Sequence, residues 1–160
     1  MSEQLVNRRT PSALVAGDVF FAMIKQGYIL PWLPESHQQN EIIIEAAAAA
    51  AGRLTEICFV VFDGVVGPWL LPTFERAAGL PDLHYVVLLP PLDVCLERVR
   101  TRVDHGFTDL SVTRDMHRQF VDAHVDSRHL ITKAETHPAG LAELIDRQLD
   151  GDQFRYSPSL

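Results

Sequence analysis

The sequence predicts an α/β domain in which a parallel sheet is covered by helices on both faces, a three-layer arrangement. Short runs that are apolar at every position occur at residues 13–16 and 57–62, and each ends next to an Asp and a Gly. Such runs are typical of strands buried on both faces. Helical patterns separate them, and alternation of strand and helix favours right-handed crossovers and parallel pairing.

Four runs are candidate strands, at residues 13–16, 57–62, 84–89 and 128–132. The first is followed by Gly17 and Asp18, and the second by Asp63 and Gly64. The third is closed by two prolines, and the fourth has a weaker apolar character. We expect all four to lie in one sheet.

A long helix is predicted over residues 35–55, where three isoleucines precede six consecutive alanines. Alanine is the best helix former, and its small side chain allows close packing against neighbours. A short helix is expected to begin at Val19, directly after the first strand, and to continue to Ile24.

Three more helices are predicted from apolar positions that repeat at intervals of three and four residues. One starts at Leu92, and the next follows Asp109 or Ser111 as its N-cap. The last opens near Thr136, a candidate N-cap, with Pro138 in its first turn. The three apolar stripes consist of Cys95, Leu96, Val99 and Val103; Val112, Met116 and Phe120; and Leu141, Leu144, Ile145 and Leu149.

The size and charge of the chain limit the classes of function. Its 160 residues, 47% of them hydrophobic, suit one domain, which we place at residues 1–150, with a polar, loosely held tail at 151–160. The net charge of -7 argues against a nucleic-acid partner. No run approaches the roughly 18 apolar residues of a membrane span. The polar start resembles no signal peptide, so we expect a cytoplasmic protein.

Nothing in the sequence indicates a metal cluster or a common hydrolase. Cys58 and Cys95 lie in apolar surroundings, which predicts buried free thiols in a reducing compartment. No Cys-x-x-Cys pair exists, and His117 and His124 are too far apart on one predicted helix to share an ion. A Gly-x-Ser-x-Gly segment is also missing from the sequence.

Two acids follow the first two strands. In open parallel sheets, ligands bind beyond the carboxyl ends of the strands, where Asp18 and Asp63 are expected. A carboxylate there can accept a proton from a substrate hydroxyl or position a magnesium ion. The alternative is that each shapes a turn or caps a helix. We favour function for Asp18, and both interpretations stay open for Asp63.

Arg98 and Arg102 lie four residues apart on one predicted helix face, without an acid three or four residues away. Like charges at this spacing repel each other, whereas an anionic ligand bound between the two arginines would make their interaction favourable. A solvated arginine face is the alternative. The following residues 105–107 suggest a break between helices, where a lid could move.

The loop around Trp32 lies between two prolines and near Tyr28. Its aromatic side chains could line a substrate pocket. They could equally form an apolar plug over the core.

Taken together, these segments resemble a family of small bacterial P-loop ATP-binding proteins, described as AAA-type ATPases or kinases. The resemblance rests on Gly-Asp-Val-Phe-Phe-Ala-Met-Ile at 17–24, Pro-Trp-Leu-Pro-Glu-Ser-His at 31–37, Val-Phe-Asp-Gly-Val-Val-Gly-Pro-Trp at 61–69, Cys-Leu-Glu-Arg-Val-Arg-Thr-Arg at 95–102 and His-Gly-Phe-Thr-Asp-Leu at 105–110. It covers about residues 12–149. The family is similar to chloramphenicol phosphotransferase and to gluconate and shikimate kinases.

The resemblance implies a nucleoside-monophosphate-kinase-like fold that uses ATP and magnesium. By motif position, Asp18 would activate the substrate hydroxyl and Asp63 would end the Walker-B-like strand. The resemblance also implies nucleotide contacts from Arg98, Arg102 and Thr132. Tyr28, Trp32 and His37 are the candidate substrate-binding residues.

The sequence departs from this family in one large respect. A phosphate-binding loop needs Gly-x-x-x-x-Gly-Lys-Ser/Thr, and no such segment occurs. Residues 2–9 resemble the far end of the helix that follows this loop, so the first strand, the loop and the helix start are expected to be missing from a truncated chain. Only Lys25 and Lys133 could replace the missing lysine. We expect altered strand pairing or a homodimer through exposed strand edges.

Two functions follow as hypotheses. One is an ATP-dependent phosphotransferase acting on a small hydroxyl-bearing molecule, inactive in this chain without the loop. The other is a non-catalytic remnant that binds a partner or a small ligand. A dinucleotide-binding protein is disfavoured, because no Gly-x-Gly-x-x-Gly follows a strand.

Overall fold

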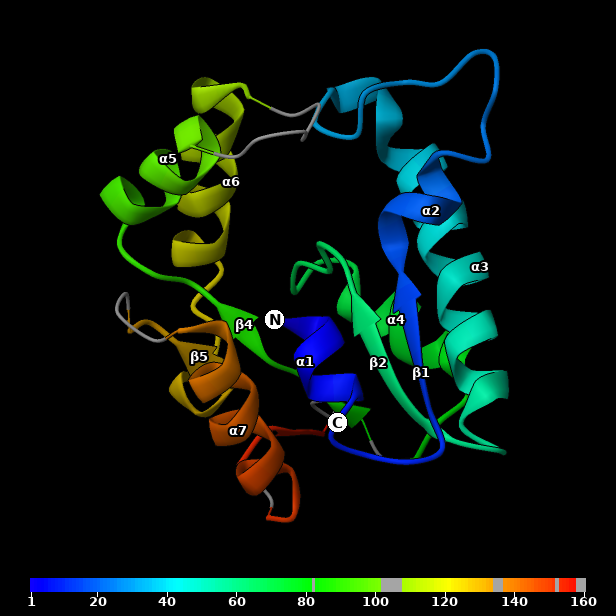
Figure 1. The fold of residues 1–160 in the computed structure, drawn as a ribbon. Helices are drawn as coiled ribbons and strands as arrows, with labels where there is room; N and C mark the ends of the chain where they lie inside the picture. The colour runs from blue at the N-terminus through cyan, green and yellow to red at the C-terminus, as the bar shows by residue number, and fades with distance from the viewer. Residues whose placement is uncertain (82, 102–107, 134–136, 152, 158–160) are drawn as a thin grey trace.

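A computed structural model describes residues 1–81, 83–101, 108–133, 137–151 and 153–157. Two parallel strand pairs form its centre (Figure 1). In the first pair, β1 (Ser12–Ala16) runs beside β2 (Phe59–Asp63), and Ala16 lies opposite Asp63. In the second, β4 (Val87–Leu88) runs beside β5 (Leu130–Ile131). The mixed α/β class and the parallel pairing of the first two predicted strands are therefore confirmed.

The single continuous sheet that we expected is not found. Among the described residues, the strands form three separate two-stranded sheets, and the third pair is antiparallel, between β3 (Leu83–His84) and β6 (Arg155–Tyr156). The run at 84–89 is thus divided between two sheets. Tyr85 accounts for the division, because its hydroxyl donates to the Val66 carbonyl at 2.7 Å while its backbone N–H donates to the Phe154 carbonyl at 2.8 Å.

Helix α1 (Ser2–Val6) lies between the two parallel pairs (Figure 1). It packs against β2 and against α7 (Pro138–Leu149). Leu5 is buried in a core cluster with residues of β5, α7 and the C-terminal segment. Beyond the helix, the guanidinium groups of Arg8 and Arg9 both bind the carboxylate of Asp146 on α7, at 2.9 and 2.8 Å. The N-terminal segment therefore joins two halves of the molecule, one that contains β1 and β2 and one that contains β4, β5 and α7.

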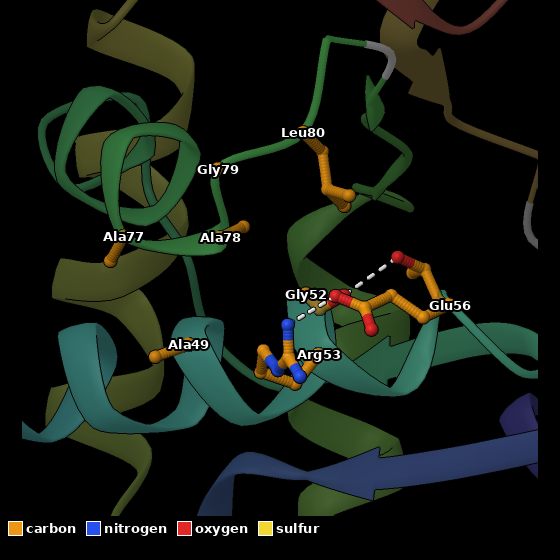
Figure 2. A pocket seen from close by; sticks show the side chains of 9 residues that line it. Ala49, Gly52, Arg53, Glu56, Ala77, Ala78, Gly79 and Leu80 are labelled. Atoms are coloured by element: carbon orange, nitrogen blue, oxygen red, sulfur yellow. Dashed lines mark hydrogen bonds and ion pairs between the residues drawn. The ribbon is translucent and has the colours of Figure 1, made fainter.

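The alanine-rich helix packs closely against its neighbour, as its composition predicts. Helix α3 (His37–Leu54) follows a 3-10 turn at Pro34–Ser36 and packs along α4 (Leu71–Ala78), a helix that the sequence analysis missed. A Cβ atom placed on Gly52 would lie 2.0 Å from the carbonyl oxygen of Ala78, so this contact needs a glycine. Figure 2 shows Gly52 and Ala78 at the ends of the two helices.

Helices α5 (Leu92–Thr101) and α6 (Leu110–Asp122) pack against each other, on the side of the molecule away from α2 (Gly17–Phe21) and α3 (Figure 1). Asp109 is the N-cap of α6, as predicted, and accepts from the backbone N–H of Ser111 at 2.8 Å. The rings of Trp69 and Phe120 lie 5.4 Å apart, which connects α6 to the segment after β2. Val103 and residues 105–107 lie outside the described residues.

Residues 153–157, the described part of the C-terminal segment, contact the core and differ from the loose tail that we expected. Phe154 is 1% exposed and belongs to the same core cluster as Leu5. Polar residues surround Phe154 in the sequence, so its burial could not be predicted from the pattern. Helix α7 is capped by His137, whose Nδ1 accepts from the Ala139 N–H at 3.4 Å, while Thr136 lies outside the described residues.

The described helices and the two cysteines relate to the composition of the chain. No helix in the described ranges has both the length and the apolar character needed to cross a membrane. Cys58 and Cys95 are free thiols, but they are half-buried and not fully buried.

His129 is a buried polar residue that ends the 3-10 turn at Ser127–His129 before β5. Its Nδ1–H donates to the Tyr85 carbonyl at 3.0 Å, and its Nε2 accepts from Arg128 Nε at 3.2 Å. Its ring lies against those of Tyr85 and Tyr156. Burial lowers the pKa of His129, and the charge of Arg128 acts in the same direction. The folded protein therefore favours the neutral imidazole.

We expect the free energy of unfolding to decrease as the pH falls below about 6.5, the ordinary pKa of histidine. The unfolded chain then binds the proton more readily than the folded one, and the loss ends below the folded pKa. Urea unfolding on either side of this pH measures the difference. His129→Gln should flatten this part of the profile, while His124→Gln, at an exposed position, should not. Equal profiles for the wild type and His129→Gln would contradict the assignment.

Candidate functional site

The two predicted acids lie at the same edge of the first strand pair. Asp63 is the last residue of β2, and Asp18 is in the first turn of α2, two residues after the end of β1. Both side chains are exposed. The loops that follow the two strands lie close together, because a Cβ atom on Gly17 would be 3.4 Å from the Asp63 carbonyl oxygen and 3.6 Å from the Cα of Gly64. The parallel register thus brings both residues to one edge.

Tyr28 lies next to this edge. Its ring contacts that of Phe21 in an edge-to-face arrangement, with the centroids 6.5 Å apart. Burial raises the pKa of the Tyr28 phenol, and the negative charge of Asp18 raises it further. At neutral pH the phenol is therefore protonated, and it can donate a hydrogen bond near the Asp18 carboxylate.

Polar side chains at the start of α3 hold the loop that carries Tyr28. Gln39 Nε2 donates to the Ile29 carbonyl at 2.7 Å, and Gln39 Oε1 accepts from the Ile29 N–H at 2.9 Å. Asn40 Nδ2 and Ser36 Oγ donate to the Pro31 carbonyl at 2.7 and 2.8 Å. The sequence analysis missed Gln39, since nothing in its spacing shows which backbone group it meets.

The other predicted substrate residues have different surroundings. Trp32 is 38% exposed on the same loop, so its side chain is partly covered. His37 opens α3, and its imidazole lies 3.5 Å from the carboxylate of Glu41, one turn further along the helix. His37 therefore lies on the exposed surface of α3.

Two of the three predicted nucleotide-binding residues, Arg98 and Thr132, lie on the other half of the molecule. Arg98 is exposed near the end of α5, and its charge lowers the pKa of Cys95, although burial raises that pKa by more. Thr132 is exposed directly after β5. Figure 1 places α5 and β5 across α1 from α2, the helix that carries Asp18. Arg102 lies outside the described residues.

The described residues do not by themselves fit a nucleoside triphosphate. Such a ligand needs backbone N–H groups that converge on the phosphates and a lysine that reaches them. Lys25 donates instead to the Ala22 carbonyl at 2.8 Å, and Lys133 is exposed after β5. Asp18 and Asp63 are ligands of the kind that Mg²⁺ prefers, but the described ranges hold no group of three or more residues suited to a metal ion.

A hollow of about 410 Å³ lies in the half of the molecule that contains β2, α3 and α4, at the end away from Asp18 and Asp63. It is lined by the end of α3 and the end of α4, and the ion pair of Arg53 with Glu56 lies at its edge (Figure 2). Since α3 ends shortly before β2 begins, the hollow is at the amino end of that strand. It is therefore separate from the edge that carries Asp18 and Asp63.

Comparison with known proteins shows a likeness of fold. No protein-family model matches the chain, and no curated protein sequence matches it. The solved structure of the tunicamycin resistance protein of Deinococcus radiodurans is similar, with a TM-score of 0.64 and 19% identity. The match covers 93% of this chain and 88% of that one. At this identity the likeness shows a shared α/β fold and leaves activity open.

Proposed function

We propose that this protein is a kinase-like phosphotransferase in fold and in acceptor site, and that its acceptor is a small hydroxyl-bearing molecule bound beside Asp18. The observation that carries the proposal is the position of Asp18. It lies just beyond the carboxyl end of a parallel strand, in the first turn of a helix, with its carboxylate exposed. A carboxylate so placed can accept the proton of an acceptor hydroxyl.

The surroundings of Asp18 support an acceptor site. Tyr28 provides a phenol that can donate a hydrogen bond nearby, and Asp63 adds a second carboxylate at the same edge. Gln39 holds the Tyr28 loop through two hydrogen bonds to the backbone of Ile29. The shared fold with the tunicamycin resistance protein is consistent with the kinase-like body that the sequence motifs suggest.

A second candidate function is binding of the acceptor without phosphoryl transfer. It is favoured by Lys25, one of the two lysines in the sequence, whose ammonium donates to the Ala22 carbonyl at 2.8 Å beside the end of α2. Both candidates place the acceptor beside Asp18. They differ in whether ATP is consumed.

One experiment separates the two candidates. The protein is incubated with ATP, magnesium and tunicamycin, the compound named for the structural neighbour, and ADP release and phosphorylated tunicamycin are measured. Transfer above the rate without protein supports the phosphotransferase. Tunicamycin binding without ADP release supports the second candidate, and absence of both contradicts both candidates for this acceptor.

Replacement of Asp18 by Asn is expected to lower the transfer rate by about 10²–10⁴-fold, the usual contribution of a general base. The amide keeps the size of the side chain but cannot take the hydroxyl proton. Asp122→Asn, at an exposed position on α6, is the matched control and should leave the rate unchanged. Equal rates for Asp18→Asn and the control would remove Asp18 from the reaction.

A further inference from the structure

The segment at residues 19–33, which we name the apolar segment, exposes an unusual number of large apolar side chains. In the part of the chain that the structure describes, half of the exposed large hydrophobic residues fall within this segment, and they are between 36% and 60% exposed. They are Val19, Met23, Tyr28, Leu30, Trp32 and Leu33. Clustered exposure of this kind marks a binding surface more often than scattered single residues do.

The apolar segment is held in place, which distinguishes it from a loose loop. The amide of Gln39 binds both backbone groups of Ile29, and Ser36 and Asn40 hold the carbonyl of Pro31. The ring of Phe21 supports that of Tyr28. A surface held in this way loses less conformational entropy when a ligand binds, so exposed apolar area there contributes more fully to affinity.

The charge within this surface limits what can cover it. Asp18 is exposed and lies close enough to Tyr28 for its charge to act on the phenol. A purely apolar partner would bury the Asp18 carboxylate without a hydrogen-bond donor, at a large cost in free energy. A ligand with a hydroxyl end and an apolar end meets both requirements. The net charge of -7 also opposes binding to an anionic lipid surface.

We propose that the apolar segment binds the apolar part of a small amphipathic hydroxyl compound whose hydroxyl end faces Asp18. This inference rests on the proposed function and adds the substrate class to it. Val65, in the loop after β2, is also exposed. The acceptor is thus distinguished from fully polar sugars and hydroxy acids.

The test compares methyl β-glucoside with hexyl β-glucoside, which share a hydroxyl-bearing head and differ only in the apolar tail. Binding is followed by amide chemical shifts in NMR, without nucleotide. Burial of one methylene tightens binding by up to about fourfold, so we expect hexyl glucoside to bind at least about tenfold more tightly than methyl glucoside. The shifts should centre on residues 28–33. Equal affinities for the two glucosides, or shifts centred elsewhere, would overturn the proposal.

Two matched variants test the location. Leu30→Ser should remove most of the advantage of the hexyl tail, whereas Ile57→Ser, at an exposed apolar position between α3 and β2, should keep it. Unchanged backbone spectra away from the substitution confirm that each variant is folded. If sedimentation shows a dimer that Leu30→Ser alone dissociates, the surface belongs to a second copy of this chain and the proposal is wrong.

The outcomes are independent of the phosphoryl-transfer test. Binding of hexyl glucoside without ADP release in the transfer experiment would leave the acceptor class intact and remove catalysis. ADP release together with equal binding of the two glucosides would support catalysis and exclude the amphipathic acceptor class.

Discussion

Replacement of Phe154 by alanine is expected to destabilise the protein by about 3–5 kcal/mol, the usual cost of deleting a buried phenylalanine side chain. Phe154 is 1% exposed and packs in one core cluster with Leu5, Ile131 and Ile145. Its removal leaves a cavity where α1, β5 and α7 meet. The backbone carbonyl of Phe154, which accepts from Tyr85, is retained by the variant.

Urea unfolding followed by circular dichroism measures this effect as a shift of the midpoint. Val121→Ala, at an exposed position on α6, is the control and should change stability by less than about 0.5 kcal/mol. A Phe154→Ala midpoint equal to that of the control would show that the C-terminal segment does not belong to the core.

Replacement of Gly52 by alanine is expected to destabilise the protein by about 1–3 kcal/mol or more, the range for overpacked cores. The added Cβ would lie 2.0 Å from the Ala78 carbonyl oxygen and 2.9 Å from its carbonyl carbon, so α3 and α4 must move apart. The intrinsic helix propensity predicts the opposite sign, because alanine is favoured over glycine inside a helix by about 1 kcal/mol. The sign of the change therefore decides between close packing and propensity.

Gly151→Ala provides the matched control for this prediction. The nearest atom to its added Cβ would be the Gln148 carbonyl oxygen at 3.8 Å, an ordinary contact. We expect its unfolding midpoint to remain close to that of the wild type. A Gly52→Ala protein more stable than the wild type would exclude the close approach of α3 and α4.

Local patterns in the sequence predicted the elements that local physics determines. The apolar runs at 13–16 and 57–62 led to the correct strands and parallel pairing, and Asp109 to the correct N-cap. Helix α4 was missed because it has only eight residues and too short a pattern. The division of the run at 84–89 depends on Tyr85, whose partners lie far away in the sequence at Val66 and Phe154.

The residues of the candidate site also differ in whether local sequence patterns could place them. Asp18 and Asp63 could be placed at one edge because parallel strands end together, and this needs only the strand assignment. The two hydrogen bonds between Gln39 and the backbone of Ile29 depend on the path of the loop between these residues. No repeat pattern in the sequence predicts that path. The spacing of Arg98 could not show that α5 lies across α1 from α2, because spacing within a helix carries no information about neighbouring elements.

The contact between Trp69 and Phe120 has a consequence for observing this protein in solution. The chain contains two tryptophans, and the other, Trp32, belongs to the apolar segment. A Trp32→Phe protein would therefore emit only from Trp69, whose indole lies 5.4 Å from the ring of Phe120 on α6. A change in the wavelength or lifetime of that emission would report whether α6 remains in contact with the segment after β2. The Trp69→Phe protein would report on the apolar segment, so the two variants give separate optical signals for the α6 contact and for the apolar segment.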